Sequence, residues 1–154
     1  MSPSPTPSSD LTLLRSLAEF RATLRAFLQF SESAALDAGL QPHQHQLLLQ
    51  VAGAPPSVAI NIAWAAERLG LRHNSAVELV DRSVREGLLT RTADPTDKRR
   101  VLLRLTAKGR RLLARLTGDH ARELQERAPR LIASLKKIQQ HSPPQPPALG
   151  REAR

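Results

Sequence analysis

The 154-residue chain contains no cysteine and no tyrosine, and only three Phe and one Trp. Without cysteine it can form no disulfide, no thiolate-ligated metal site and no catalytic or redox-sensing thiol. So few aromatic rings disfavour the folds that stack unpaired bases. No apolar run approaches the ~18 residues of a membrane span, and residues 1–10 lack the features of a signal peptide. We therefore expect a soluble protein without membrane contact that stays in the cytoplasm.

Acidic residues are also scarce, with 14 Asp or Glu against 23 Lys or Arg, which gives a formal charge of +9 and a pI of about 11.4. This balance favours a polyanionic partner, with nucleic acid ahead of an anionic membrane surface. Residues 67–115 alone hold 13 of the basic residues and six of the acidic ones. On charge alone, a solvated arginine-rich surface would explain this segment equally well.

Proline is concentrated at the two ends of the chain. Seven of the 12 prolines lie there, at positions 3, 5, 7, 143, 144, 146 and 147. Such segments cannot bury enough apolar surface to order themselves. We expect disordered tails at residues 1–8 and 142–154, and one folded domain at residues 9–141.

Two long helices are predicted at the ends of the folded part, at about residues 10–38, after an Asp10 or Ser9 cap, and 107–140. Pro129 should break or kink the second helix, starting a new segment there. Each helix carries an apolar stripe spaced by 4, 3, 4 and 3 residues, which one small domain can hardly bury alone. We therefore predict a homodimer that pairs these helices. The stripes are Leu13, Leu17, Phe20, Leu24 and Phe27, then Leu124, Ala128, Leu131, Leu135 and Ile138.

Two short helices around a glycine turn are predicted at about residues 61–87. Asn61 is a good N-cap for the first helix, which should place Ile62, Ala63, Ala66 and Leu69 on one side and end at Gly70. The second should run over residues 73–86. This is the helix-turn-helix arrangement.

The spacing of apolar residues then changes from a helical period to strict alternation, which predicts a β-hairpin wing at about residues 88–106. Its strands should cover residues 88–92 and 100–105, joined by a turn at residues 94–97. Before the two helices, another short helix should begin with Pro42, and Pro55 with Pro56 should force an extended connection. The fold class is therefore mainly α with a small β-hairpin wing.

Four motifs occur in a characteristic order within this region. They are Leu-Val-Asp-Arg at 79–82, Gly-Leu at 87–88, Asp-Pro-x-Asp-x-Arg at 94–99 and Leu-Thr-x-x-Gly at 105–109. With the stretch at residues 69–82, this ensemble resembles the MarR family of bacterial transcription regulators, over about residues 10–140. The resemblance implies a winged helix-turn-helix that hangs from a dimerisation region made by the terminal helices.

The resemblance also implies which residues contact DNA. The helix at residues 72–82 would enter the major groove, with Arg72, His73, Asn74, Ser75, Glu78 and Arg82 outward. Asparagine can read adenine and glutamate can accept from cytosine, although Glu78 and Arg82 are also spaced to pair with each other. In the wing, Asp97 would hold Arg99 in or beside the minor groove, and Lys98 and Arg100 would contact phosphates.

Two positions depart from the family pattern. Trp64 stands where the family often has the glutamate of a capping box, and we expect it to pack against the wing or the second helix. Arg72 stands where a serine cap is common. The second helix should therefore be less well capped, which leaves Arg72 to contact phosphate.

Many family members bind a small phenolic or aromatic carboxylate. Candidate lining residues here are Phe27, Phe30, His43, Gln46, Leu47 and Trp64, with a plain core role as the alternative for the apolar ones. His43 and His45 are two residues apart and would point in different directions on a helix, so we predict neither a metal nor a cofactor.

No phosphate-binding loop, nucleophile elbow or His-Glu-x-x-His motif is present in the sequence, so we predict no enzyme. The expected function is a homodimeric repressor, associated with the nucleoid, that binds a pseudo-palindromic double-stranded operator and is released by a small ligand. The alternative is a winged-helix module, architectural or interaction-mediating, that binds nucleic acid without sequence preference. Bulk competitor DNA would separate the two.

Overall fold

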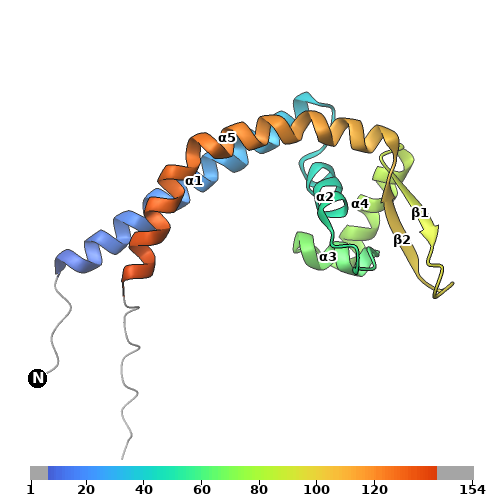
Figure 1. The fold of residues 1–154 in the computed structure, drawn as a ribbon, viewed down its shortest axis with the longest axis horizontal. Helices are drawn as coiled ribbons and strands as arrows, with labels where there is room; N and C mark the ends of the chain where they lie inside the picture. Colours follow the sequence, from blue (N-terminus) through green and yellow to red (C-terminus); the bar gives the residue numbers. More distant parts are fainter. Residues whose placement is uncertain (1–6, 142–154) are drawn as a thin grey trace, which may run out of the picture. The chain divides into compact units, whose positions relative to one another are not determined.

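The computed structural model describes residues 7–141, with side chains from Asp10 onward. In chain order its elements are α1 (Pro7–Asp37), α2 (Pro42–Gly53), α3 (Ile62–Leu69), α4 (His73–Arg85), β1 (Leu89–Ala93), β2 (Val101–Leu105) and α5 (Ala107–Gln140) (Figure 1). The mainly α fold with one small hairpin is therefore confirmed for the described residues.

The termini of the chain differ partly from the prediction. Helix α1 begins at Pro7, three residues before the predicted Asp10 start, so residues 7 and 8 are helical rather than part of a tail. The rest of the predicted tails, residues 1–6 and 142–154, lies outside the described residues. The chain divides into two compact units, one formed by residues up to Phe27 with those from Gln125 onward, the other by Leu28–Leu124.

The first unit buries small polar side chains and exposes large apolar ones. Ser16 and Thr23 of α1 and Ser134 of α5 are buried, and residues from both helices line one groove. Leu13, Phe20, Leu24 and Phe27 of the predicted α1 stripe are half-buried, whereas Leu17 is exposed. Five apolar side chains of this unit are 41–61% exposed: Leu11, Leu14, Leu17, Ile132 and Leu135. Within the described residues nothing covers these side chains, so both helices expose apolar surface.

Helix α5 contradicts the predicted break at Pro129. It runs without interruption from Ala107 to Gln140 with Pro129 inside it. A proline removes one helical N–H and crowds the carbonyl four residues earlier. In a helix of 34 residues the remaining backbone bonds carry the helix through that point.

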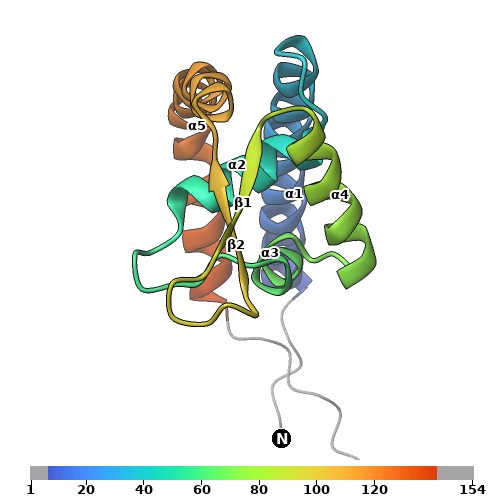
Figure 2. The ribbon, with the colours of Figure 1, turned by 90° about the vertical axis from the view of Figure 1, so that its right-hand side faces the viewer.

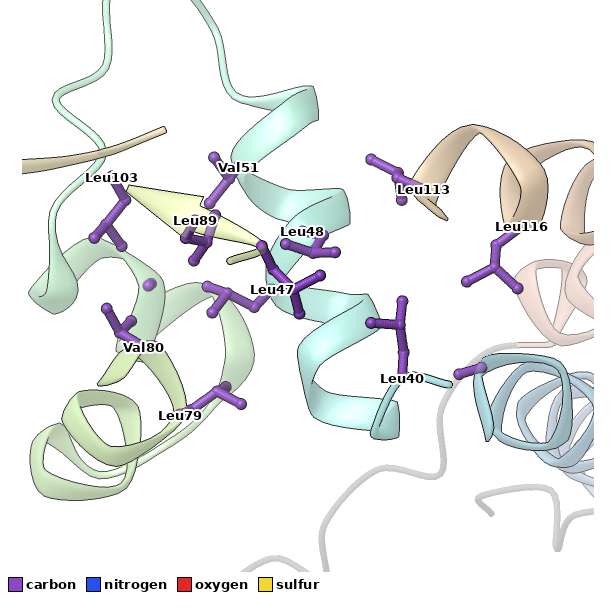
Figure 3. Close-up of a cluster of buried hydrophobic side chains, with 13 residues drawn as sticks. Leu40, Leu47, Leu48, Val51, Leu79, Val80, Leu89, Leu103, Leu113 and Leu116 are labelled. Atoms are coloured by element: carbon purple, nitrogen blue, oxygen red, sulfur yellow. The ribbon is translucent and has the colours of Figure 1, made fainter. Parts of the chain in front are cut away.

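The core of the second unit joins α2, α4, the hairpin and the start of α5. Leu47 and Leu48 of α2 lie against Val80, Leu89 and Leu103, all of them almost completely buried (Figure 3). Figure 2 shows the hairpin and helices that supply these residues. Leu47 thus has the core role that was the alternative to ligand binding.

The hairpin is close to its prediction, with a one-residue difference in each strand. The antiparallel register pairs Leu89 with Leu105 and Ala93 with Val101. The connection before α3 is not extended throughout, because the Val58 amide donates to the Pro55 carbonyl in a turn at 3.0 Å. Further along, the Leu103 amide donates to the Ile60 carbonyl at 2.8 Å, which ties this connection to β2.

Helix α3 has the predicted ends but a different buried face. The Trp64 amide donates to Asn61 Oδ1 at 2.9 Å, and Gly70 ends the helix with φ of 63°, in the left-handed region that favours glycine. Ala65 and Ala66 are buried, whereas Ala63 is exposed, contrary to the prediction. The half-buried Trp64 packs against the core, as expected for a packing residue.

The Leu-Thr-x-x-Gly motif joins the start of α5 to the start of the hairpin. The Thr106 hydroxyl lies 2.6 Å from the Gly87 carbonyl and accepts from the Gly109 amide at 3.0 Å. A Cβ at Gly109 would lie 2.3 Å from the Leu88 carbonyl oxygen. Glycine is therefore needed at this position because the two backbones approach so closely.

Candidate nucleic-acid interface

Helix α4 has one buried face and one polar, exposed face. Ala76, Leu79, Val80 and Ser83 are buried in the domain. The six residues predicted to contact DNA from this helix are all exposed: Arg72, His73, Asn74, Ser75, Glu78 and Arg82. The structure therefore places them together on the solvent side of α4, as the apolar periodicity indicated.

The N-terminus of α4 is as weakly capped as predicted. Arg72 occupies the N-cap position and its side chain makes no capping hydrogen bond. In the described part of the chain, no ion pair joins Glu78 to Arg82, so the alternative role of the two as a pair is not realised. Both side chains face solvent.

One ion pair that the sequence analysis missed links α4 to the wing. Arg91 of β1 pairs with Asp81 of α4, and both side chains are partly exposed. This contact links the wing to the helix and neutralises one of the nearby cations. No local pattern predicts it, because the two residues meet only after the hairpin has packed.

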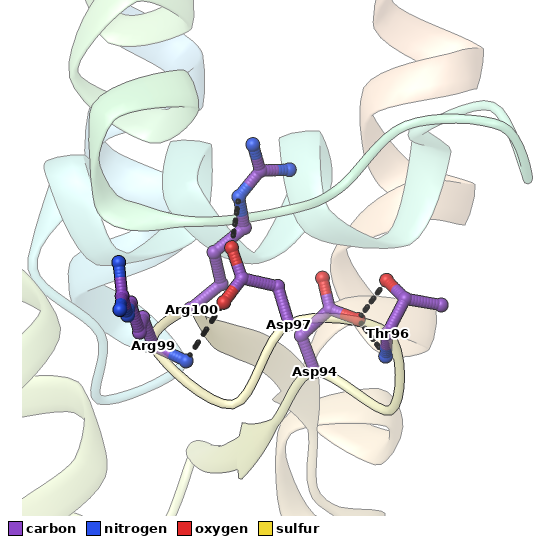
Figure 4. A network of polar contacts seen from close by, with 5 residues as sticks. All are labelled: Asp94, Thr96, Asp97, Arg99 and Arg100. Atoms are coloured by element: carbon purple, nitrogen blue, oxygen red, sulfur yellow. Dashed lines mark hydrogen bonds and ion pairs between the residues drawn. The ribbon is translucent and has the colours of Figure 1, made fainter.

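The turn at the tip of the wing is built around Asp94. This carboxylate is 7% exposed and accepts from the Thr96 amide at 2.8 Å and from the Thr96 hydroxyl at 2.7 Å (Figure 4). These two hydrogen bonds lower the pKa of Asp94 below its ordinary value. Asp94 therefore stays ionised and holds the turn that presents the next four residues.

Asp97 holds the wing in a different way from the one implied by the family resemblance. One carboxylate oxygen accepts from the Arg99 backbone amide at 3.0 Å, and the other lies 3.5 Å from Arg100 Nε. Asp97 thus supports the main chain at Arg99 and the side chain of Arg100. The Arg99 side chain extends away from the Asp97 carboxylate (Figure 4) and is exposed, as is Lys98.

The exposed face of α4 and the wing tip together combine two kinds of polar group. Asn74, Ser75 and Glu78 offer hydrogen bonds from a rigid helix, which suits the edges of base pairs in a groove. The cations Arg82, Lys98 and Arg99 offer sequence-independent attraction to phosphates. Such a surface fits double-stranded nucleic acid.

A separate, mostly apolar cavity of about 760 Å³ lies within the second unit. The end of α2 and the following connection contribute Val51, Pro55, Pro56, Val58 and Ile60, and the far side is formed by β2 and the start of α5. Two cations, Arg104 and Arg110, also line it, and Arg110 Nη1 donates to the Leu105 carbonyl at 2.9 Å.

The six predicted ligand-lining residues do not come together, and none lines that cavity. His43 and Gln46 are exposed, Leu47 is in the core, and Phe30 and Trp64 are half-buried. Phe27 belongs to the other unit. On α2 the buried polar residues are Gln44 and His45.

The buried His45 belongs to a cluster of rings that sequence reasoning missed. Its ring lies 4.6 Å from that of His120 on α5, centroid to centroid, and the His120 ring meets Phe30 edge-on at 5.5 Å. His120 Nδ1 is 2.7 Å from the Leu116 carbonyl and Nε2 is 2.8 Å from the Ser31 hydroxyl. Burial, with a smaller effect of His120, lowers the pKa of His45.

Residues 7–141 offer neither a metal cluster nor a membrane span. No group of three or more His, Cys, Asp or Glu side chains is arranged to hold a metal ion there. None of the described helices is long and apolar enough to cross a membrane.

Elements α2, α3 and α4 with the β1–β2 hairpin form a winged helix-turn-helix domain. Residues 38–100 match the model of the MarR family. A candidate transcriptional regulatory protein for the hcr operon of Thauera aromatica is 29% identical over 111 residues, which are 72% of this chain. The chain spans 65% of the length of that relative.

Two solved structures share the fold at low identity. An E. coli MarR mutant complexed with operator DNA superposes with a TM-score of 0.59 at 21% identity, over 77% of this chain and 89% of the other. CouR from Rhodococcus jostii, bound to p-coumaroyl-CoA, has a TM-score of 0.60 at 23% identity, over 90% of this chain and 98% of the other.

Proposed function

We propose that this chain is a sequence-specific transcription regulator that binds double-stranded DNA. The observation that carries the proposal is the exposed polar face of α4 beside a wing tip of three cations, Lys98, Arg99 and Arg100. The similarity to a candidate operon regulator, and a fold shared with a protein complexed with operator DNA, support it. We assign this surface to binding rather than to catalysis. We place the protein in the bacterial cytoplasm, at the nucleoid.

The two parts of the surface have different roles. Helix α4 enters the major groove, where Asn74, Ser75 and Glu78 contact base edges and Arg72 and Arg82 contact the flanking phosphates. The Arg99 side chain reaches the minor groove, with its main chain held by Asp97. Lys98 and Arg100 contact phosphates. His73 lies at the start of α4, where it can contact either a base edge or a phosphate.

The functional unit is a homodimer that represses transcription by occupying a pseudo-palindromic operator. The exposed apolar face that includes Leu11, Leu14, Ile132 and Leu135 supports this, because a second copy would cover it. A two-fold dimer presents two α4 helices, and these suit half-sites about one helical turn of DNA apart.

The effector is a small aromatic or phenolic carboxylate held in the 760 Å³ cavity. Its apolar walls suit a ring and its two arginines suit a carboxylate, within the ordinary size range of ligand sites. A protein of the same fold is bound to p-coumaroyl-CoA, a thioester whose acyl part carries a phenol ring, and this supports the phenolic part of the assignment. The cavity touches β2 and α5, so a ligand that prefers one arrangement of the wing changes the affinity for DNA. Bound DNA weakens the affinity for that ligand by the same factor.

Titration with competitor DNA tests the function. A labelled duplex selected for binding is held at physiological salt while unrelated duplex is added in excess. Base readout should leave the selected duplex bound roughly a thousand-fold more tightly than the competitor. If the two compete equally, the protein is instead a non-specific or architectural module held by phosphate contacts alone.

A further inference from the structure

Gln44 is a buried polar side chain whose two amide atoms are both used. It lies near the start of α2 and is 1% exposed. Its Nε2 donates to Glu86 Oε2 at 2.8 Å, and its Oε1 accepts from the Gln41 backbone amide at 3.0 Å. Because each atom has a partner, the orientation of the amide is determined and its donor points at α4.

Glu86 is the C-cap residue of α4 and connects three helices. Its carboxylate accepts from Gln44 of α2, and its backbone carbonyl accepts from Lys108 Nζ of α5 at 2.8 Å. Its own amide donates to the Arg82 carbonyl in the last turn of α4 at 3.0 Å. The C-terminal end of the exposed helix is therefore fixed to both neighbouring elements.

A small tilt at this end would move the other end of α4 considerably. Asn74 lies 12 residues before Glu86, which is roughly 18 Å along a helix. A tilt of ~5° about Glu86 therefore displaces Asn74 by roughly 1.5 Å, more than the tolerance of a hydrogen bond to a base edge. Long lysine and arginine side chains can follow such a shift and keep their phosphate contacts.

We propose that Gln44 and Glu86 are positioning residues for sequence readout, a role that rests on the proposed function. Their hydrogen bond sets the angle of α4 without touching DNA. Losing it therefore lowers the preference for the selected sequence much more than the affinity for unrelated DNA. The charge on Glu86 strengthens the bond, and the burial of Gln44 makes the loss costly because its amide would be left unpaired.

The test uses an exchange of the two side chains in the full-length protein. Gln44→Glu places a second carboxylate against Glu86 and should lower the ratio of selected to unrelated duplex affinity at least ~10-fold. Glu86→Gln alone keeps an acceptor for Gln44 and should change the ratio less than ~3-fold. The double variant Gln44→Glu with Glu86→Gln restores a donor–acceptor pair in the reverse direction and should recover the ratio.

Controls separate positioning from folding. Gln50→Glu makes the same change on the same helix, where the side chain accepts from Arg68 Nε at 2.9 Å, and should leave the ratio unchanged. Thermal unfolding by circular dichroism is recorded for every variant. If Gln44→Glu does not fold, Glu86→Ala, which leaves the Gln44 amide unpaired, is expected to show the same loss of ratio.

Two results would overturn the inference. One is a folded Gln44→Glu or Glu86→Ala variant with the wild-type ratio, and the other is a folded double variant that fails to recover it. A wild-type protein without preference for any duplex would instead overturn the proposed function, and that measurement comes first.

Discussion

Arg99 is the wing residue that contributes most directly to the proposed DNA contact. Its backbone is held by Asp97, its side chain is exposed, and it extends away from the rest of the turn. Arg99→Ala should weaken binding of the selected duplex by about 1–3 kcal/mol, or roughly 5- to 150-fold, because a groove contact is lost.

Fluorescence anisotropy at fixed salt measures this loss, with thermal unfolding as a check on folding. Arg21→Ala removes an exposed cation of α1 outside the proposed interface and serves as the matched control. Equal affinities of the two variants would mean that Arg99 does not contact DNA.

His45 makes the stability of the second unit depend on pH. Burial lowers its pKa, so the folded protein favours the neutral ring while the unfolded chain has the ordinary value of 6.5. The unfolded state then binds more protons below pH 6.5, and stability should fall as the pH decreases from about 7 to 5. His45→Gln should flatten this part of the profile of unfolding temperature against pH.

The exposed His43→Gln variant is the control, since that ring faces solvent two residues earlier on α2. A wild-type profile that is flat between pH 7 and 5, or one that His45→Gln leaves unchanged, would contradict this assignment.

Residue positions were predictable where one helix face decided them. The outward residues of α4 follow from the spacing of Ala76, Leu79 and Val80, since the opposite face must be exposed. The contact between the rings of His45 and His120 could not be found this way, because 75 positions separate the two residues and only packing brings them together. The same holds for the hydrogen bond between Gln44 and Glu86.

At the scale of elements, the close contact between α5 and the hairpin gives Gly109 a structural role. Gly109→Ala would place a Cβ 2.3 Å from the Leu88 carbonyl oxygen, and one of the two backbones must move. We expect a loss of about 1–3 kcal/mol in the free energy of unfolding, as for other overpacked sites. Denaturant unfolding measures it.

Gly118 provides the comparison within the same helix. Its Cβ would meet only the end of the Arg122 side chain at 3.8 Å, so Gly118→Ala should stabilise the helix by about 0.5–1 kcal/mol. The idea of a close approach at Gly109 would be abandoned if both substitutions shifted stability in the same direction by similar amounts.

Elements were predictable from caps and periodicity, and their details were not. Asn61, Gly70 and Pro42 marked helix ends correctly, because each satisfies or omits a backbone group at a terminus. Pro129 did not end α5, because a long helix tolerates one missing bond. The turn at Pro55 and its contact with β2 depend on a partner that is distant in the sequence.

For the whole molecule, the exposed apolar face of α1 and α5 leads to the proposed dimer. Leu135 is 44% exposed on α5, and Leu135→Asp would place a charge in the interface between two copies. We expect the dimer dissociation constant to rise at least ~100-fold, with operator binding lost in parallel. Sedimentation analysis across a range of protein concentrations measures this.

Leu49→Asp is the control, because that side chain is equally exposed, at 46%, but lies on α2 outside the proposed dimer helices. A Leu135→Asp protein that sediments as wild type does would exclude this face as the interface.

Sequence-specific binding by a two-fold dimer can be tested by selecting duplexes from random DNA and footprinting the protein on them. We expect one enriched pseudo-palindrome of ~20 base pairs, with half-sites about one helical turn apart and two chains bound. Binding without any enriched sequence would contradict it and would leave a protein that attaches to DNA through its phosphates alone.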